Sequence, residues 1–146
     1  MKYNDRLAFQ AEKERQQYSQ QIQSRAVAQK KFEKMLDGLL LMYSCRVKNP
    51  NQAIKSKLAG ENIVDVREED LLYFPNLTHL DVSDNQIVLS QLLNLVSLEE
   101  LDLQYNNVDQ LHLNLGCFPK MQTLVLSYNK VPAGQLAELG KLPALT

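Results

Sequence analysis

The sequence predicts an α/β solenoid with short parallel β-strands, preceded by a long N-terminal α-helix. Three observations support this fold class. An eleven-residue motif occurs three times at spacings of 21 and 23 residues, residues 5–36 contain neither Gly nor Pro, and the hydrophobic fraction of 45% is ordinary for a globular protein. A chain of 146 residues is long enough for one repeat domain and an appended helix.

The repeated motif places aliphatic residues at fixed distances from one asparagine. It reads L-x-x-L-x-L/V-x-x-N-x-I/V, with methionine at the first position of the third copy. The copies begin at Leu77, Leu98 and Met121, and their asparagines are Asn85, Asn106 and Asn129. We therefore expect repeats over 77–97, 98–120 and 121–144, and the start of another repeat at 145.

Each position of the motif has a structural role. The alternation of aliphatic and polar residues around Leu80 predicts a short strand with its aliphatic side chains inward. The chain must then bend away, which leaves backbone N–H and C=O groups buried at the bend. An asparagine amide can bond to these groups, so stacked repeats should align Asn85, Asn106 and Asn129 into a structural ladder.

These residues resemble the leucine-rich repeat family, whose consensus is L-x-x-L-x-L-x-x-N-x-L. The resemblance implies a ribbon of parallel strands that binds other proteins. Units of 21–24 residues without cysteine caps are similar to the intracellular group that contains the phosphatase regulatory subunit and the axonemal dynein light chain. The junction around Leu36-Asp37-Gly38 and Glu61-Asn62 is also similar to one intracellular member of this family.

A degenerate first repeat is expected over 54–76. Asn62 lies 23 residues before the first motif asparagine, Ile54, Ala59 and Val64 fall on motif positions, and Lys57 replaces a leucine. At the other end, the sequence stops one residue into a new unit without a polar cap. We therefore expect a piece of a longer protein, which aggregates when expressed alone.

Residues 1–44 are expected to form a helical arm, and residues 45–53 a connector to the repeats. The arm is rich in good helix formers, and Gly38 is the position where it could break. An apolar stripe at helical spacing should dock on the open N-terminal edge of the repeats. Its members are Phe32, Met35, Leu36, Leu39, Leu40 and Tyr43.

The first part of the arm, residues 7–29, has only scattered apolar positions. Glu14, Arg25 and Gln29 would fall on the seam of a coiled coil, which argues against self-association. Residues 1–36 carry net charge +4 and the remainder −5. Three alternatives stay open: a solvated helix, a helix ordered on a large acidic assembly such as a tubulin surface, and, less favoured, contact with nucleic acid, which we do not expect.

The sequence predicts no catalytic, metal or cofactor site. Phosphate-binding, zinc-hydrolase and nucleophile motifs are absent, and His79 and His112 lack a cysteine or histidine at ligand spacing. The longest apolar run has five residues and no signal peptide is present, so we expect no membrane contact. Two cysteines, Cys45 and Cys117, indicate a reducing compartment, and we expect a cytoplasmic protein.

The remaining candidate is a surface on the predicted concave face. Acidic side chains with tyrosines beside them should attract and anchor a basic segment of a partner protein. The expected partner-binding residues are His79, Asp81, Asp84, Glu100, Asp102, Gln104, Tyr105, Thr123 and Tyr128. The alternative is that these side chains only keep the ribbon soluble.

Two functions stay open. The first is a non-catalytic protein–protein interaction scaffold in a large cytoskeletal assembly such as the ciliary or flagellar axoneme, with tubulin, dynein or radial-spoke components as partners. The second is a regulatory subunit that recruits an enzyme of the phosphatase type through the concave face. The axonemal and phosphatase roles follow from the family resemblance and not from repeat spacing.

Overall fold

The structure, a computed structural model, describes the backbone of residues 3–146 and the side chains of residues 5–23 and 32–146. The chain divides into two compact units, Met1–Glu33 and Lys34–Thr146. Residues 34–44 therefore belong to the repeat unit, whereas the sequence analysis placed them in the arm.

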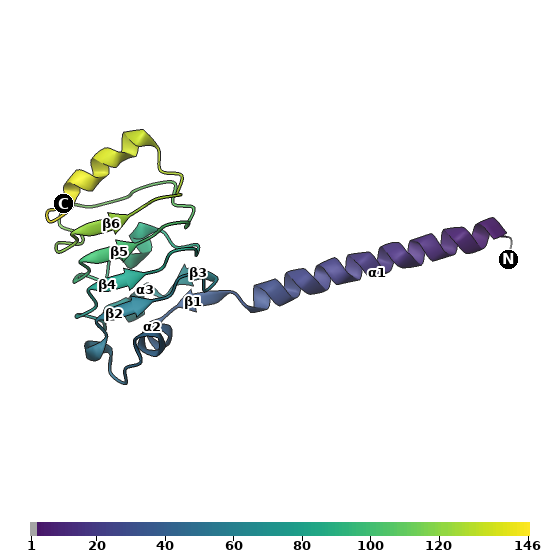
Figure 1. Ribbon diagram of the computed structural model, residues 1–146, viewed down its shortest axis with the longest axis horizontal. Helices are drawn as coiled ribbons and strands as arrows, with labels where there is room; N and C mark the ends of the chain where they lie inside the picture. Colours follow the sequence, from purple (N-terminus) through teal and green to yellow (C-terminus); the bar gives the residue numbers. More distant parts are fainter. Residues whose placement is uncertain (1–2) are drawn as a thin grey trace. The chain divides into compact units, whose positions relative to one another are not determined.

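The first unit contains one helix, α1 (Tyr3–Lys31), seen in Figure 1. Its 29 residues span about 43 Å at about 1.5 Å per residue. All side chains from Asp5 to Gln23 are exposed, so nothing within the unit covers them. Residues 1–2 of the expected arm, and its seam positions Arg25 and Gln29, lie outside the described backbone or side chains.

The expected helical arm over 1–44 is not one continuous helix. After α1 the chain forms strand β1 (Lys34–Leu36), which pairs in parallel with β3 (Ile63–Val66). The Lys34 N–H donates to the Asn62 carbonyl at 2.9 Å, and the Leu36 carbonyl accepts from Arg67 N–H at 2.8 Å. In this pairing Leu36 lies opposite Val66 and is completely buried.

A second helix, α2 (Gly38–Cys45), then covers the N-terminal end of the repeats. Asp37 caps it by accepting a hydrogen bond from Leu40 N–H at 2.9 Å. Gly38 N–H donates to Asp70 Oδ2 at 2.9 Å, which ties the start of α2 to the first return segment. The helix ends at Arg46, whose φ of 55° is left-handed.

The chain before the repeats packs on their N-terminal edge, as predicted, but only part of the predicted apolar stripe faces that edge. Leu36 and Leu41 are buried, and Leu40, Met42 and Cys45 pack against the core. The other four expected stripe residues are exposed: Phe32, Met35, Leu39 and Tyr43, with exposed fractions of 77% for Leu39 and 81% for Tyr43. The break at β1 changes the helical phase, so spacing counted from Phe32 selects the wrong side.

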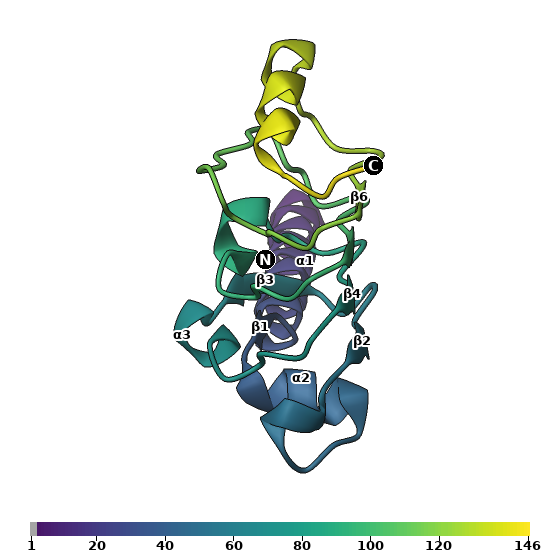
Figure 2. The same ribbon diagram turned by 90° about the vertical axis from the view of Figure 1, so that its left-hand side faces the viewer.

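The repeats form a parallel sheet in the order β2-β4-β5-β6. Its strands are β2 (Lys55–Lys57), β4 (His79–Asp81), β5 (Glu100–Asp102) and β6 (Thr123–Val125). In Figure 2, β2, β4 and β6 lie along one side of this unit, and helix α3 (Glu68–Leu71) lies on the other. Leucine-rich repeats with short parallel strands and helical returns give an α/β repeat fold.

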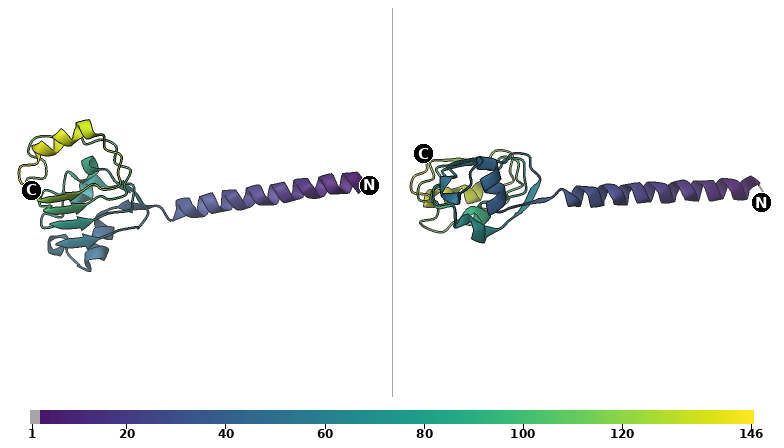
Figure 3. Two further views of the ribbon diagram at one scale, coloured as in Figure 1. Left: turned by 45° about the horizontal axis from the view of Figure 1, so that its top comes forward. Right: turned by 90° about the horizontal axis from the view of Figure 1, so that it is seen from below.

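The return segments differ between repeats. The first contains α3, the second the 3₁₀ helix η2 (Leu89–Leu92), and the last the 3₁₀ helix η3 (Ala133–Lys141). Figure 3 shows η3, in yellow, at the end of the repeat unit opposite α2. At that end Thr146 N–H donates to the Gln122 carbonyl at 3.2 Å, as Gln122 N–H does to the Glu99 carbonyl at 2.8 Å one repeat pair earlier.

The first repeat is present, but its register is one residue earlier than expected. Ser56, not Lys57, pairs with Leu80. Side chains alternate with a period of two, so a slip of one residue exchanges the buried and exposed faces. The buried residues are therefore Ala53, Ser56, Leu58 and Ile63, whereas Ile54, Ala59, Lys57 and Asn62 are exposed and Val64 is half-buried.

A serine can occupy this core position because its hydroxyl has a partner. Ser56 Oγ lies 2.5 Å from Ser44 Oγ on α2, and Ser44 also donates to the Leu41 carbonyl at 2.8 Å. The buried hydroxyl is thus satisfied by the helix that covers the first repeat.

The motif asparagines bond the backbone of neighbouring repeats. Asn85 Oδ1 accepts from Ile63 N–H at 2.9 Å, and Asn106 Oδ1 accepts from Ile87 N–H at 2.8 Å. Asn129 Oδ1 accepts from Asn106 N–H at 2.9 Å. Each amide Nδ2 also donates to carbonyl oxygens of its own and the preceding repeat, including Leu58, Val82 and Leu103.

Candidate functional site

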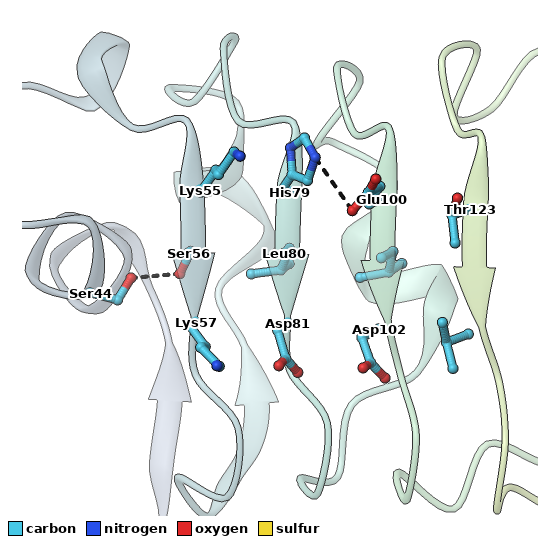
Figure 4. A pocket seen from close by; sticks show the side chains of 12 residues that line it. Ser44, Lys55, Ser56, Lys57, His79, Leu80, Asp81, Glu100, Asp102 and Thr123 are labelled. Carbon is cyan, nitrogen blue, oxygen red and sulfur yellow. Dashed lines mark hydrogen bonds and ion pairs between the residues drawn. The ribbon is translucent and has the colours of Figure 1, made fainter.

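The outward side chains of β2, β4, β5 and β6 form a continuous surface, here called the strand face. Figure 4 shows these side chains together with Ser44 of α2 and with the buried residues Ser56 and Leu80 between them. The outward and the buried residues together line a hollow of about 410 Å³, wide enough for a few side chains of a bound segment. Its polar lining residues are Ser44, Lys55, Ser56, Lys57, His79, Asp81, Glu100, Asp102 and Thr123.

The strand register places charged residues in two rows. One row runs Lys55–His79–Glu100–Thr123 and the other Lys57–Asp81–Asp102–Val125. Neighbouring parallel strands lie about 4.8 Å apart, so each row changes from basic to acidic to uncharged within three such steps. The strand face is therefore not uniformly acidic.

The two lysines of this surface do not follow from the repeat spacing. That spacing places Lys57 at a core position and gives Lys55 no role. Periodicity gives no signal for them, because the buried residue between the two lysines, Ser56, is itself polar.

The acidic side chains are held by neighbours on their own strands and turns. Asp81 Oδ1 accepts hydrogen bonds from Ser83 N–H at 3.0 Å and from Ser83 Oγ at 2.7 Å. Asp102 accepts from the N–H and from Nε2 of Gln104, both at 3.0 Å. These bonds fix the carboxylates at the ends of β4 and β5 and leave part of each carboxylate open to a ligand.

His79 connects the two middle strands, β4 and β5, at the end where both strands begin. Its Nε2 lies 3.4 Å from Glu100 Oε2, and its Nδ1 lies 2.7 Å from Thr78 Oγ1. The Thr78 contact orients the ring so that Nε2 faces the carboxylate. Three of the predicted side chains, His79, Glu100 and Thr123, thus share one row.

Three further predicted residues lie beyond the strands, in the turns. Asp84, Tyr105 and Tyr128 occupy equivalent places with left-handed φ values of 55°, 54° and 58°, and Gly60 occupies the place before them at 64°. The rings of Tyr105 and Tyr128 stack with centroids 4.4 Å apart and planes 3° from parallel. The predicted residues therefore divide into a strand-face group and this turn row.

The pKa of Tyr105 is raised above its ordinary value of 10.0. Loss of solvent around the phenol is the main cause, and the phenol of Tyr128 and the charge of Asp84 add to it. We expect the Tyr105 Cζ ¹³C signal to titrate at higher pH in the folded chain than in urea. The neutral phenol thus stabilises the fold below about pH 10, and this contribution disappears as pH rises through the folded pKa.

Asp84→Asn should lower the Tyr105 midpoint, because it removes one of the opposing charges. Asp109→Asn, at an exposed position outside this row, should leave the midpoint in place. Equal midpoints in the two variants would contradict an influence of Asp84.

Among the side chains of residues 5–23 and 32–146, no three His, Cys, Asp or Glu residues gather as a metal site would require. Cys45 and Cys117 are unpaired and half-buried in the described part of the chain. No helix in the part of the chain that the structure describes is long and apolar enough to cross a membrane.

The chain contains leucine-rich repeats, and it is similar to the proteins of that family. The strand register and the asparagine bonds agree with this, and a model of the family described as "Leucine Rich repeat" matches residues 75–87 and 94–109. In such proteins the repeat is generally an interaction module for other proteins.

A particular relative shares more of the chain. This chain is similar to X-ray radiation resistance-associated protein 1 of Mus musculus, with 24% identity over 111 residues. The similarity covers 76% of this chain and 14% of the mouse protein.

Proposed function

We propose that this chain is a non-catalytic protein–protein interaction scaffold that binds a partner segment across the strand face. The observation that supports the proposal most directly is the in-register change of charge from Lys55 and Lys57 to Asp81 and Asp102. Such a surface selects its partner by charge, because like charges placed opposite one another cost several kcal/mol.

The expected partner segment is of mixed charge. Its basic residues would lie over β4 and β5, where the sequence analysis placed a basic segment. An acidic residue beside them would face β2, since Lys55 and Lys57 are exposed there. The half-buried side chain of Val125 on β6 offers an apolar contact at the uncharged end of its row.

Helix α1 supports a role within a larger assembly. Its side chains over 5–23 are exposed, and apolar residues such as Leu7, Tyr18 and Ile22 have no cover within their own unit. A helix of this length gains most of its stability from packing, so an external surface would order it. We propose a cytoskeletal assembly such as the ciliary or flagellar axoneme as that surface.

The test of the strand face is the double variant Glu100→Lys with Asp102→Lys. Each reversal replaces an attraction with a repulsion, so capture of the partner from cell lysate should fall at least about tenfold. The whole chain is immobilised, and recovered proteins are quantified by mass spectrometry. The matched control is Glu69→Lys with Asp109→Lys, which makes the same charge change at exposed positions away from the strands.

Equal capture by the double variant and its control would refute the strand face as the binding surface. Recovery of tubulin, dynein or radial-spoke components that depends on Glu100 and Asp102 supports the assembly role. Stoichiometric recovery of a phosphatase catalytic subunit would instead replace it with the regulatory-subunit function.

A further inference from the structure

The turn row consists of Gly60, Asp84, Tyr105 and Tyr128. Its two aromatic rings are followed along the row by the carboxylate of Asp84. Tyr105 lies between Asp84 and Tyr128, because the turns follow strands in the order β2-β4-β5-β6. Tyr128 covers one face of the Tyr105 ring in a near-parallel stack. Asp84 is the neighbour of Tyr105 on the other side of the row, and its charge contributes to the raised pKa of Tyr105.

Two small residues precede Tyr105 in the row. Aspartate is shorter than tyrosine, so the stack stops above Asp84. Gly60 precedes it in the row, and a Cβ built there would meet only Asp84 Oδ2, at 3.5 Å. Gly60, Asp84 and Tyr105 follow one another in the turn row, and the three together are here called the notch.

The Asp84 carboxylate differs from those of the strand face. Asp81 and Asp102 accept hydrogen bonds from the residues that follow them. Over residues 3–146 the structure gives the Asp84 carboxylate no hydrogen bond or ion pair with another described side chain. Both of its oxygens are thus available to a ligand.

We propose that the notch binds an arginine side chain of a partner protein, which rests on the proposed function because the arginine belongs to the bound protein. A guanidinium is planar, so it can continue the stack on the face of Tyr105 that Tyr128 does not cover while donating two hydrogen bonds to Asp84. The absence of a side chain at Gly60 leaves room for the arginine stem. Lysine offers a point charge without a stacking plane, and therefore fits the notch less well.

The repeat turns hold the backbone at these positions. The left-handed conformation recurs at Gly60, Asp84, Tyr105 and Tyr128, so it is a feature of the turns and not of one residue. The turn hydrogen bonds hold this row in place, since Asp84 N–H donates to the Gln104 carbonyl at 2.8 Å and Gly60 N–H to Ser83 at 2.9 Å. The notch is therefore built before the ligand arrives.

The test is an NMR titration of the ¹⁵N-labelled whole chain with acetyl-arginine methylamide. We expect shifts of the Gly60, Asp84 and Tyr105 amides. Binding should be about 2- to 5-fold tighter than that of the lysine analogue, which lacks the stacking plane, and than that of the citrulline analogue, which lacks the charge. Equal shifts with arginine and citrulline, or shifts spread evenly over all acidic residues, would overturn the proposal.

Three variants keep the left-handed backbone, because asparagine tolerates it. Asp84→Asn should remove the preference for arginine over citrulline, Tyr105→Asn should remove the stacking plane, and Gly60→Asn should fill the notch. Tyr73→Asn, at an exposed tyrosine in another segment, is the matched control and should bind arginine like the parent chain. Undiminished arginine binding by the three notch variants would also overturn it.

The notch and the strand face can fail separately. If arginine does not bind but partner capture still depends on Glu100 and Asp102, the notch is refuted and the scaffold function stands. If capture is independent of Glu100 and Asp102 while arginine shifts Asp84 and Tyr105, the notch stands and the strand face is refuted.

Discussion

Asn106→Ala is expected to lower the free energy of unfolding by about 3 kcal/mol, the upper part of the range for stranding buried backbone groups. Asn106 is 2% exposed, and its amide serves two repeats. It accepts from Ile87 N–H at 2.8 Å and donates to the carbonyls of Val82 and Gln104 at 2.9 and 3.0 Å. Alanine leaves these groups without a partner, and water cannot reach all of them.

Urea unfolding followed by the near-ultraviolet circular dichroism of tyrosine measures this loss, since the sequence has no tryptophan. Asn114→Ala is the matched control, because Asn114 is exposed and its side chain makes no hydrogen bond within the described residues. Asn129→Ala should cost less than Asn106→Ala, since Asn129 is only half-buried and water can replace part of its bonding. Equal costs for Asn106 and Asn114 would contradict a structural role of the motif asparagine.

The repeat spacing predicted the sheet from β4 to β6, because aliphatic residues occupy the same buried positions in each of these units. The pairs Leu80 with Leu101 and Leu101 with Leu124 follow directly from the spacing. The first repeat lacks this pattern at its centre, where Ser56 is buried by a partner on α2. A tertiary hydrogen bond decided that register, and single-sequence periodicity contains no information about it.

The strand-face rows could be predicted as far as that register was known. His79 with Glu100, and Asp81 with Asp102, pair as the spacing indicates, while Lys55 could only be found by shifting the first repeat. The break in the arm had a local signal, the Asp37 cap before Gly38, but the pairing of β1 with β3 is a long-range contact. The stacking of Tyr105 on Tyr128 likewise depends on side-chain conformations that the sequence does not specify.

Leu101→Ala is expected to cost about 3 kcal/mol, within the range measured for leucine truncation in packed cores. Leu101 is 1% exposed and lies at the centre of the sheet, between Leu80 and Leu124. Both neighbouring repeats pack against it. The repeat of β4 cannot move into the cavity without breaking its pairing with β2, whereas β6 is the last strand of the described sheet and is paired only with β5. The cavity should therefore close only in part, from the β6 side, which places the cost inside the range and below its upper end.

The matched control removes the same atoms from an exposed position. Leu115→Ala, at a leucine that is 86% exposed, should change the free energy of unfolding by less than about 0.5 kcal/mol. Urea unfolding of both variants gives the two values under one set of conditions. A repeat stack shares its core between neighbours, so a loss at Leu101 should lower the stability of the second and third repeats together. If Leu101→Ala and Leu115→Ala had similar effects, the aliphatic residues of the motif would not form the shared core on which the stacking of these repeats depends.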